Sequence, residues 1–412
     1  MLLNRYKLNI KIFYVVVFFT WLSFWIPIYV LFYQSLGLNY TQIFLMTSIR
    51  SVASIILVIP SGVFADYYGR KSSIIIAIIC QIIGFILLLV GSSFGVLIIA
   101  NIFVGAYFAF MNGPDVAIVY ESLKTIGEEK RFKLNQTIKS GIILFSLSLA
   151  SLIGGLVAEK VGFRLVILLN VIAYTLALIC ALFLKEPQKI NNLKNASIYL
   201  HLKDSLNVLL KNTNLFAMSI ILAIFSLTLE VSQSIIQPYL KQAGLNIKYF
   251  GFINALFLVI AGISSFAIIY LNKNDKSTRR HIFFSTIFII IQFLILSLFL
   301  NTYVAVIAVS ILQIAKGTSA VVISDYTNKH TDEKNRATVF SIQGFIVSIL
   351  SSLAIPMFGL ISDKSNNIQV TYFSLATFVL IIGLIVGSII YKTKLIGIYN
   401  KLLGRNAYSY QS

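Results

Sequence analysis

The segment PSGVFADYYGRKSS, residues 60–73, interrupts a part of the chain that is otherwise almost entirely apolar. Isoleucine, leucine, valine and phenylalanine dominate both flanks, yet the segment carries two glycines, an aspartate, an arginine and a lysine. Gly62 and Gly69 permit a tight turn or a close backbone approach. Asp66 is a carboxylate that needs a partner at the edge of an apolar region, and Arg70 lies four residues further on. The segment therefore predicts a charged connection between two long apolar helices.

The composition of the whole chain predicts an integral membrane protein. Of the 412 residues, 58% are hydrophobic and only 11% are charged, which is too apolar for a soluble globule. The net charge of +19 does not indicate a nucleic-acid partner, because the basic residues are spread among short connections. Neither cysteine has a partner or metal-ligand spacing nearby, so we expect no metal and no cofactor.

Apolar stretches of about 20 residues recur along the chain and predict an all-α fold with twelve transmembrane helices. We expect an N-terminal six-helix bundle at 1–185, a cytoplasmic connection at 186–213 and a C-terminal six-helix bundle with a short tail at 214–412. The predicted spans are 12–34, 41–65, 72–93, 95–122, 134–158, 163–184, 214–240, 248–271, 282–301, 302–327, 336–361 and 369–391.

The two predicted bundles resemble one another in sequence. GLVAEK at 155–160 matches GLISDK at 359–364, and Glu121 matches Asp325 at the same offset of about 204 residues. EEK at 128–130 matches DEK at 332–334 at that offset as well. Several matches at one offset indicate duplicated, pseudo-symmetric halves, as in many secondary transporters.

The distribution of basic residues predicts the orientation. With both termini in the cytoplasm, lysines and arginines favour the inside connections by roughly five to one. We therefore expect a multi-pass protein of the cell (inner, cytoplasmic) membrane with both termini cytoplasmic. The basic residues left on the outside are Lys160, Arg164, Lys241, Lys248 and Lys364.

The stretch GVFADYYGRK, residues 62–71, resembles the G-x-x-x-D-x-x-G-R-K signature of the major facilitator superfamily. The resemblance implies a central cavity between the two bundles and a gating motif on the cytoplasmic side. In it Asp66 would lie near the end of the eleventh span, and Arg70 would bridge Asp66 to Glu121 at the end of the fourth. Lys71 would face lipid headgroups. The motif residues are Gly62, Asp66, Gly69, Arg70, Lys71 and Glu121.

Two further stretches, NGPDVAIVYESLK at 112–124 and QPYLKQAG at 237–244, resemble bacterial drug-efflux-like members of that superfamily. Two positions depart from the pattern of such members. Gly154 and Gly155 lack the preceding glycine–proline pair found in the fifth span of antiporters, and Val58 replaces a carboxylate.

Charged residues inside predicted spans are candidates for substrate binding or proton coupling. A charge near the bilayer centre costs about 2.5 kcal/mol or more unless it meets a cavity or a partner. The family architecture places the first, fourth, seventh and tenth spans around the cavity, and three of the four charges lie on them. The four are Arg50, Asp115, Glu230 and Lys316.

Polar neighbours extend these candidates. Asp115 follows Asn112 by three residues, so both are expected on one helix face, with Pro114 kinking the helix beside them. Glu230 belongs to a polar face that includes Gln233 and Gln237 at helical spacing. Alternatively, the charges form structural ion pairs, Glu230 with Lys316 and Asp115 with Arg50. Arg50 is expected to brace a carboxylate.

Aromatic residues four apart predict a stripe along the first span. These are Trp21, Trp25, Tyr29 and Tyr33, of which Trp25 and Tyr29 are the candidates to stack on a ligand. The alternative for all four is packing or an interfacial belt.

The leading prediction is a monomeric secondary transporter that works by alternating access and exports a small amphipathic or cationic compound in exchange for protons. Glu230 is the first candidate for the proton-binding carboxylate and Asp115 the second. A transporter of an anionic or lipid-linked substrate, with Lys316 and Arg50 meeting its charge, is the alternative. A non-transporting sensor is disfavoured by the short loops, and an enzyme by the lack of a nucleophile or a catalytic pair.

Overall fold

The computed structural model describes residues 2–187, 213–271 and 275–402, and within these residues the chain is built from helices without strands. Eleven helical segments of the described chain are long and apolar enough to cross a membrane. The first span, which is broken, makes the twelfth. The predicted connection 186–213 lies mostly outside the described residues.

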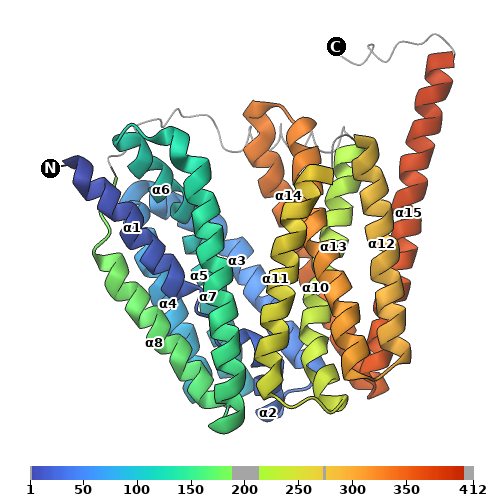
Figure 1. Ribbon diagram of the computed structural model, residues 1–412, viewed down its shortest axis with the longest axis horizontal. Helices are drawn as coiled ribbons and strands as arrows, with labels where there is room; N and C mark the ends of the chain where they lie inside the picture. Colours follow the sequence, from blue (N-terminus) through green and yellow to red (C-terminus); the bar gives the residue numbers. More distant parts are fainter. Residues whose placement is uncertain (1, 188–212, 272–274, 403–412) are drawn as a thin grey trace.

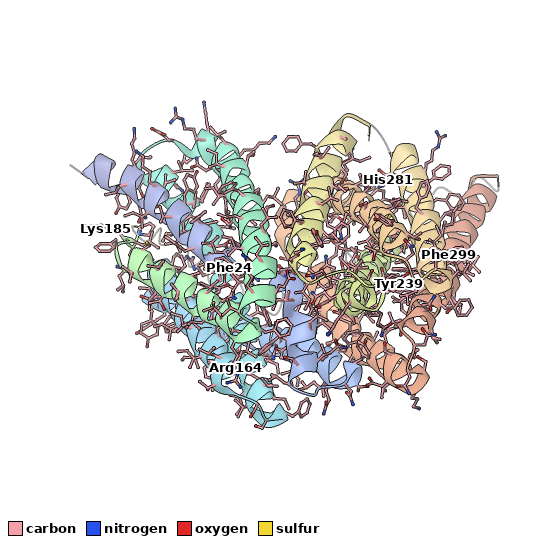
Figure 2. All side chains as sticks on the ribbon, turned by 60° about the horizontal axis from the view of Figure 1, so that its bottom comes forward. Phe24, Arg164, Lys185, Tyr239, His281 and Phe299 are labelled. Atoms are coloured by element: carbon pink, nitrogen blue, oxygen red, sulfur yellow. The ribbon has the colours of Figure 1, made fainter. Side chains whose placement is uncertain are left out.

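Two bundles of six spans lie side by side, and the start of α1 and the end of α15 lie at the same edge of the molecule (Figure 1). In Figure 2, Arg164 and Lys185 mark the two ends of α8, which crosses the N-terminal bundle. The N-terminal bundle contains α1 (Leu2–Thr20), η1 (Ile26–Ile28), α2 (Tyr29–Ser35), α3 (Tyr40–Tyr68), α4 (Arg70–Val90), α5 (Phe94–Met111), α6 (Pro114–Thr125), η2 (Glu129–Arg131), α7 (Phe132–Lys160) and α8 (Phe163–Leu182). The C-terminal bundle contains α10 (Thr213–Gln242), α11 (Lys248–Leu271), α12 (Asp275–Leu298), α13 (Thr302–Lys329), α14 (Glu333–Ser365) and α15 (Ile368–Leu402).

The helix ends follow local capping chemistry. Asn39 and Gln42 form a capping box at the start of α3, and Asn301 accepts hydrogen bonds from the first turn of α13. Both capped helices begin within one residue of the predicted starts of their spans, at Tyr40 and Thr302.

Two predicted spans are broken rather than continuous. The first stops being helical after Thr20 and resumes at Ile26, where Pro27 occupies the first turn of η1. The fourth breaks at Asn112 and Gly113, and Pro114 begins α6. Gly113 has φ +101°, a left-handed conformation that glycine adopts without strain, and proline suits a helix start.

The two bundles meet along α3 with α14 and along α7 with α11. Small residues let these backbones approach closely, as is usual where helices pack in a membrane. A Cβ on Gly155 would lie 2.8 Å from the backbone nitrogen of Gly251, and one on Gly359 would lie 2.8 Å from the Cα of Thr41. Both contacts lie near the end of the molecule away from the termini.

Candidate functional site

Two adjoining cavities lie between the bundles, with volumes of about 220 and 210 Å³. We call them the pair cavity and the lysine cavity after their charged residues. The pair cavity contains Arg50 and Glu230, and the lysine cavity contains Lys316. Ile26, Tyr29 and Gln233 line both, so the two are neighbouring compartments of one site.

The pair cavity is crossed by an ion pair between the bundles. Arg50, from α3, places Nη2 3.4 Å from Oε1 of Glu230, from α10. Each side chain remains about one-quarter to one-third exposed, at 24% and 32% respectively. The expectation that Arg50 contacts a carboxylate is therefore confirmed, whereas the alternative of an ion pair between Arg50 and Asp115 is wrong.

Aromatic side chains line part of this cavity. Trp21, Trp25 and Tyr29 all line it, and the Trp25 ring centroid lies 5.7 Å from that of Tyr29. Tyr33 is instead buried, where its hydroxyl accepts a hydrogen bond of 2.9 Å from Asn101. The predicted stripe on one continuous helix is wrong, because residues 21–25 leave the helical path.

The break in the first span is held by residues of other helices. The backbone N–H of Phe24 donates to Asn170 in α8 over 3.1 Å, and a Cβ on Gly154 would overlap the Phe24 carbonyl. Gln237, in α10, accepts from the Val30 N–H and donates to the Ile26 carbonyl, each over 2.9 Å. Gln237 was predicted to bind substrate, but both ends of its amide are engaged in holding the first span against the other bundle.

The lysine cavity collects amides around one cation. Lys316 and Gln313 come from α13, Gln233 from α10 and Asn254 from α11. Asn254 donates a hydrogen bond of 2.8 Å to Ser151 in α7. Among the described residues, Lys316 has no ion-pair partner, so the alternative of a Glu230–Lys316 ion pair is wrong.

Asp115 lies outside both cavities. Its Oδ2 accepts a short hydrogen bond from Lys139 of α7, and its Oδ1 accepts from the Gly113 N–H. Lys139 pairs with Asp115 and also lies over the ring of Phe13. Asn112 is exposed on the other side of the helix break, so the predicted common face of Asn112 and Asp115 is also wrong.

The gating motif forms a charged cluster at the end of the molecule where the termini lie. Arg70 Nη1 is 2.7 Å from Oδ1 of Asp66, and Arg70 Nε is 3.5 Å from Oε1 of Glu121. The predicted bridge from Asp66 through Arg70 to Glu121 is confirmed. Lys71 differs from its prediction, because its Nζ donates to the carbonyl of Leu182 over 2.7 Å.

Glu186 is a further member of this cluster, and no motif in the sequence indicated it. Its carboxylate accepts from the backbone N–H groups of Arg70 and Lys71, over 2.6 and 2.8 Å, at the start of α4. A carboxylate at a helix N-terminus satisfies free N–H groups and meets the positive end of the helix dipole. Gly69 makes room for it, because a Cβ there would lie 2.5 Å from the carboxyl carbon of Glu186.

A second helix cap joins the bundles at the opposite end. Asp363, near the end of α14, accepts from the backbone N–H groups of Tyr40 and Thr41, over 2.9 and 2.8 Å, at the start of α3. The sequence carried a signal for this residue, since Asp363 belongs to the repeated GLISDK segment. By contrast, α3 is less covered around its other end: Tyr67 and Tyr68 are exposed, and no other part of the described chain lies within 4 Å of a Cβ on Gly62.

Two helical bundles that are joined at one end, with a polar site between them crossed by an ion pair, have the architecture of a membrane transporter. Residues 13–355 match the family model of the Major Facilitator Superfamily, and the chain belongs to that family. It is a multi-pass membrane transporter.

Known relatives agree with this assignment. The chain is 22% identical over 366 residues to an uncharacterized MFS-type transporter, YxaM, of Bacillus subtilis (strain 168), covering 86% of this chain and 89% of the relative. A bacterial homolog of the human lysosomal transporter Spinster, in an inward-facing and unoccupied conformation, superposes with a TM-score of 0.72 at 17% identity. That match covers 87% of this chain and 83% of the other. The nucleoside transporter NupG superposes with a TM-score of 0.71 at 14% identity, covering 93% and 99% of the two chains. At these identities the solved structures share the fold.

Proposed function

We propose that this protein is a proton-coupled secondary transporter that exports a small amphipathic compound by alternating access, with Glu230 as the proton-binding group. The observation that carries the proposal is the ion pair between Arg50 and Glu230. It joins the two bundles, and it lies where a substrate would bind between them. A device that couples proton binding to movement of the bundles needs both properties.

Proton binding acts on this pair through charge. An ionised Glu230 attracts the guanidinium of Arg50 and holds α10 against α3. A proton on Glu230 removes that attraction, so Arg50 is released toward the cavity and the bundles can separate at this level. A carboxylate that is neutral in one state and charged in the other is a simple coupling element.

The orientation follows from the basic residues. With the termini in the cytoplasm of a bacterial-type inner membrane, the conformation described here is closed toward the outside by Asp363 and open toward the cytoplasm. In the outward-open state, we expect Asp66 to cap the start of α14 and Gly62 to allow close contact between the bundles. We further propose that the transporter works as a monomer, since each bundle pair holds a complete site.

The contacts of the acidic residues support export of a cation less well than the sequence pattern did. That prediction counted Glu230 and Asp115 as two acids of one cavity. Asp115 lies elsewhere and is neutralised by Lys139, while Glu230 is paired with Arg50. An anionic substrate is the second candidate, because Lys316 remains without a counter-charge among the described residues lining the site.

Purified protein in proteoliposomes tests the proposal. A pH gradient is imposed, a panel of lipophilic cations and aromatic carboxylates is added, and lumenal pH is followed with a trapped dye. We expect a substrate-dependent proton flux that Glu230→Gln abolishes.

The matched control is Glu159→Gln, which removes a carboxylate at the exposed end of α7 and should retain the flux. Equal proton flux in wild type and Glu230→Gln would show that Glu230 does not carry the coupling. Flux of compounds without proton movement would leave a transporter that is not proton-coupled.

A further inference from the structure

The charges that line the two cavities do not balance. Among the described lining residues, Arg50 and Glu230 neutralise one another, and Lys316 is left as an uncompensated cation. Removing a charged group from water without a partner is costly, so such groups usually meet an opposite charge or a water-filled cavity. The site as a whole therefore favours a ligand that brings a negative charge.

A second polar group lies beside Lys316 with unused hydrogen-bonding capacity. Gln313 is one helical turn away on α13, and its side chain is buried, with 4% exposed. Neither end of its amide has a hydrogen-bond partner among the described residues. An ammonium next to an amide N–H is a pair of donors suited to a carboxylate or sulfonate oxygen.

Apart from the amides of Gln233, Gln237 and Asn254, most of the remaining wall of the lysine cavity is apolar. Phe250 and Phe257 come from α11, Leu147 from α7 and Ile236 from α10. Its volume of about 210 Å³ is below the roughly 300–1,000 Å³ typical of sites for drug-sized ligands. A ligand with one or two rings and one anionic group matches both the size and the lining.

We propose that Lys316 and Gln313 form the anion-binding end of the transport site, and that its ligand is a small amphipathic organic monoanion. The apolar part of the ligand packs against Phe250 and Phe257, and its anionic group contacts the Lys316 ammonium. This inference rests on the proposed function, because it places the ligand in the site assigned to transport, and it names the substrate class of that site.

Three ligands of one shape and different charge test the assignment. The probes are 1-naphthoate, 1-naphthamide and 1-naphthylmethylammonium, titrated by calorimetry into the full-length protein in lipid nanodiscs at neutral pH without a gradient. We expect 1-naphthoate to bind about tenfold or more tightly than the amide, since hydrogen bonds to charged groups are the stronger ones. The ammonium should bind most weakly.

Variants locate the source of this preference. Lys316→Gln should remove the advantage of 1-naphthoate over 1-naphthamide, and Lys316→Arg should retain it. Lys364→Gln removes an exposed charge at the end of α14 and serves as the matched control. If Lys316→Gln does not fold, Gln313→Glu supplies an internal carboxylate beside Lys316 and should likewise remove the advantage of 1-naphthoate over 1-naphthamide.

The inference is overturned if wild type shows no preference for 1-naphthoate, including no binding of any probe, or if the preference persists in Lys316→Gln. The test is separable from that of the proposed function because it needs neither a pH gradient nor Glu230. Binding that depends on Lys316 without proton-coupled flux would refute the proposed coupling and leave the subsite. Proton-coupled flux without a preference for 1-naphthoate would refute the anion-binding subsite and leave the proposed coupling.

Discussion

At the scale of single residues, the four charges that the sequence singled out as candidates have three different environments. Arg50 and Glu230 pair between the bundles, Asp115 pairs with Lys139 inside one bundle, and Lys316 faces a cavity without an ion-pair partner in the described part of the chain. A pair within a bundle moves as a unit when the bundles rock, whereas a pair between bundles must change. Whether an ion pair changes during transport therefore depends on whether its two residues belong to the same bundle.

A double-mutant cycle tests the structural role of Asp115. Asp115→Asn leaves the Lys139 charge largely buried without its partner, so we expect a loss of stability of about 1–3 kcal/mol. Adding Lys139→Gln should restore much of it, which thermal unfolding in detergent would measure. If instead both variants keep full stability and lose transport, Asp115 has a functional role that the contacts do not indicate.

Glu128, in the connection before α7, predicts a pH effect outside the membrane. The hydrogen bond from Lys7, and then the nearby Arg131, lower the pKa of the Glu128 carboxyl below its ordinary value of 4.5. Because folding lowers this pKa, the ionised Glu128 carboxylate stabilises the folded protein at pH values above 4.5. This contribution to stability is lost as the pH falls through the folded-state pKa.

Comparing thermal unfolding of wild type with Glu128→Gln checks the Glu128 prediction. The variant should be slightly less stable at neutral pH and equal to wild type in acid. A difference of the same size at both pH values would contradict it.

At the scale of elements, the turn between α3 and α4 and the interior of α3 place different demands on their glycines. Gly69 has φ +100° and faces the Glu186 carboxylate, so a side chain there is both strained and obstructed. Gly62 lies within the α3 helix, with open space around it in this conformation.

Paired alanine substitutions separate the two glycines. Gly69→Ala should lower the thermal stability, and Glu186→Ala in the same chain should relieve the obstruction but not the backbone strain. Gly62→Ala should be neutral or raise stability by up to about 1 kcal/mol, because alanine favours the helix. Reduced transport by a stable Gly62→Ala would support close contact at this position in the other state, and full activity would argue against it.

At the scale of the whole molecule, α3 and α14 run antiparallel across the boundary between the bundles. Each helix carries an aspartate near its C-terminal end, Asp66 in α3 and Asp363 in α14. Because the helices are antiparallel, the N-terminus of each lies at the same end of the molecule as the C-terminus of the other. Asp363 caps α3 in the conformation described here. Rocking the bundles would separate that cap and bring Asp66 toward the start of α14, so the two caps would alternate.

Asp363→Asn should therefore shift the population away from the conformation described here. A carboxylate at a helix N-terminus contributes about 0.3–2 kcal/mol, which corresponds to a change of up to roughly thirtyfold in the population ratio. Asp66→Asn should shift the population in the opposite direction.

Distances between spin labels at the exposed positions Tyr68 and Asn328, measured after both native cysteines are replaced, report on the open end. The distance should shorten in Asp363→Asn and keep its present value in Asp66→Asn. Unchanged distance distributions in both variants would show that these caps do not control the equilibrium.

The sequence by itself determined the membrane class, the positions of the spans to within a few residues for most helices, the duplication and the Asp66–Arg70–Glu121 cluster. These depend on apolar length, on charge and on residues that either lie close in the chain or match the signature of a family. The tertiary structure alone decided which partner each buried charge meets. Arg50 and Glu230 are 180 residues apart, and two broken helices separate Asp115 from the cavity and bring Trp25 into it. Spacing along a chain predicts contacts only where the helix is continuous, and it says nothing of how two bundles pack against one another.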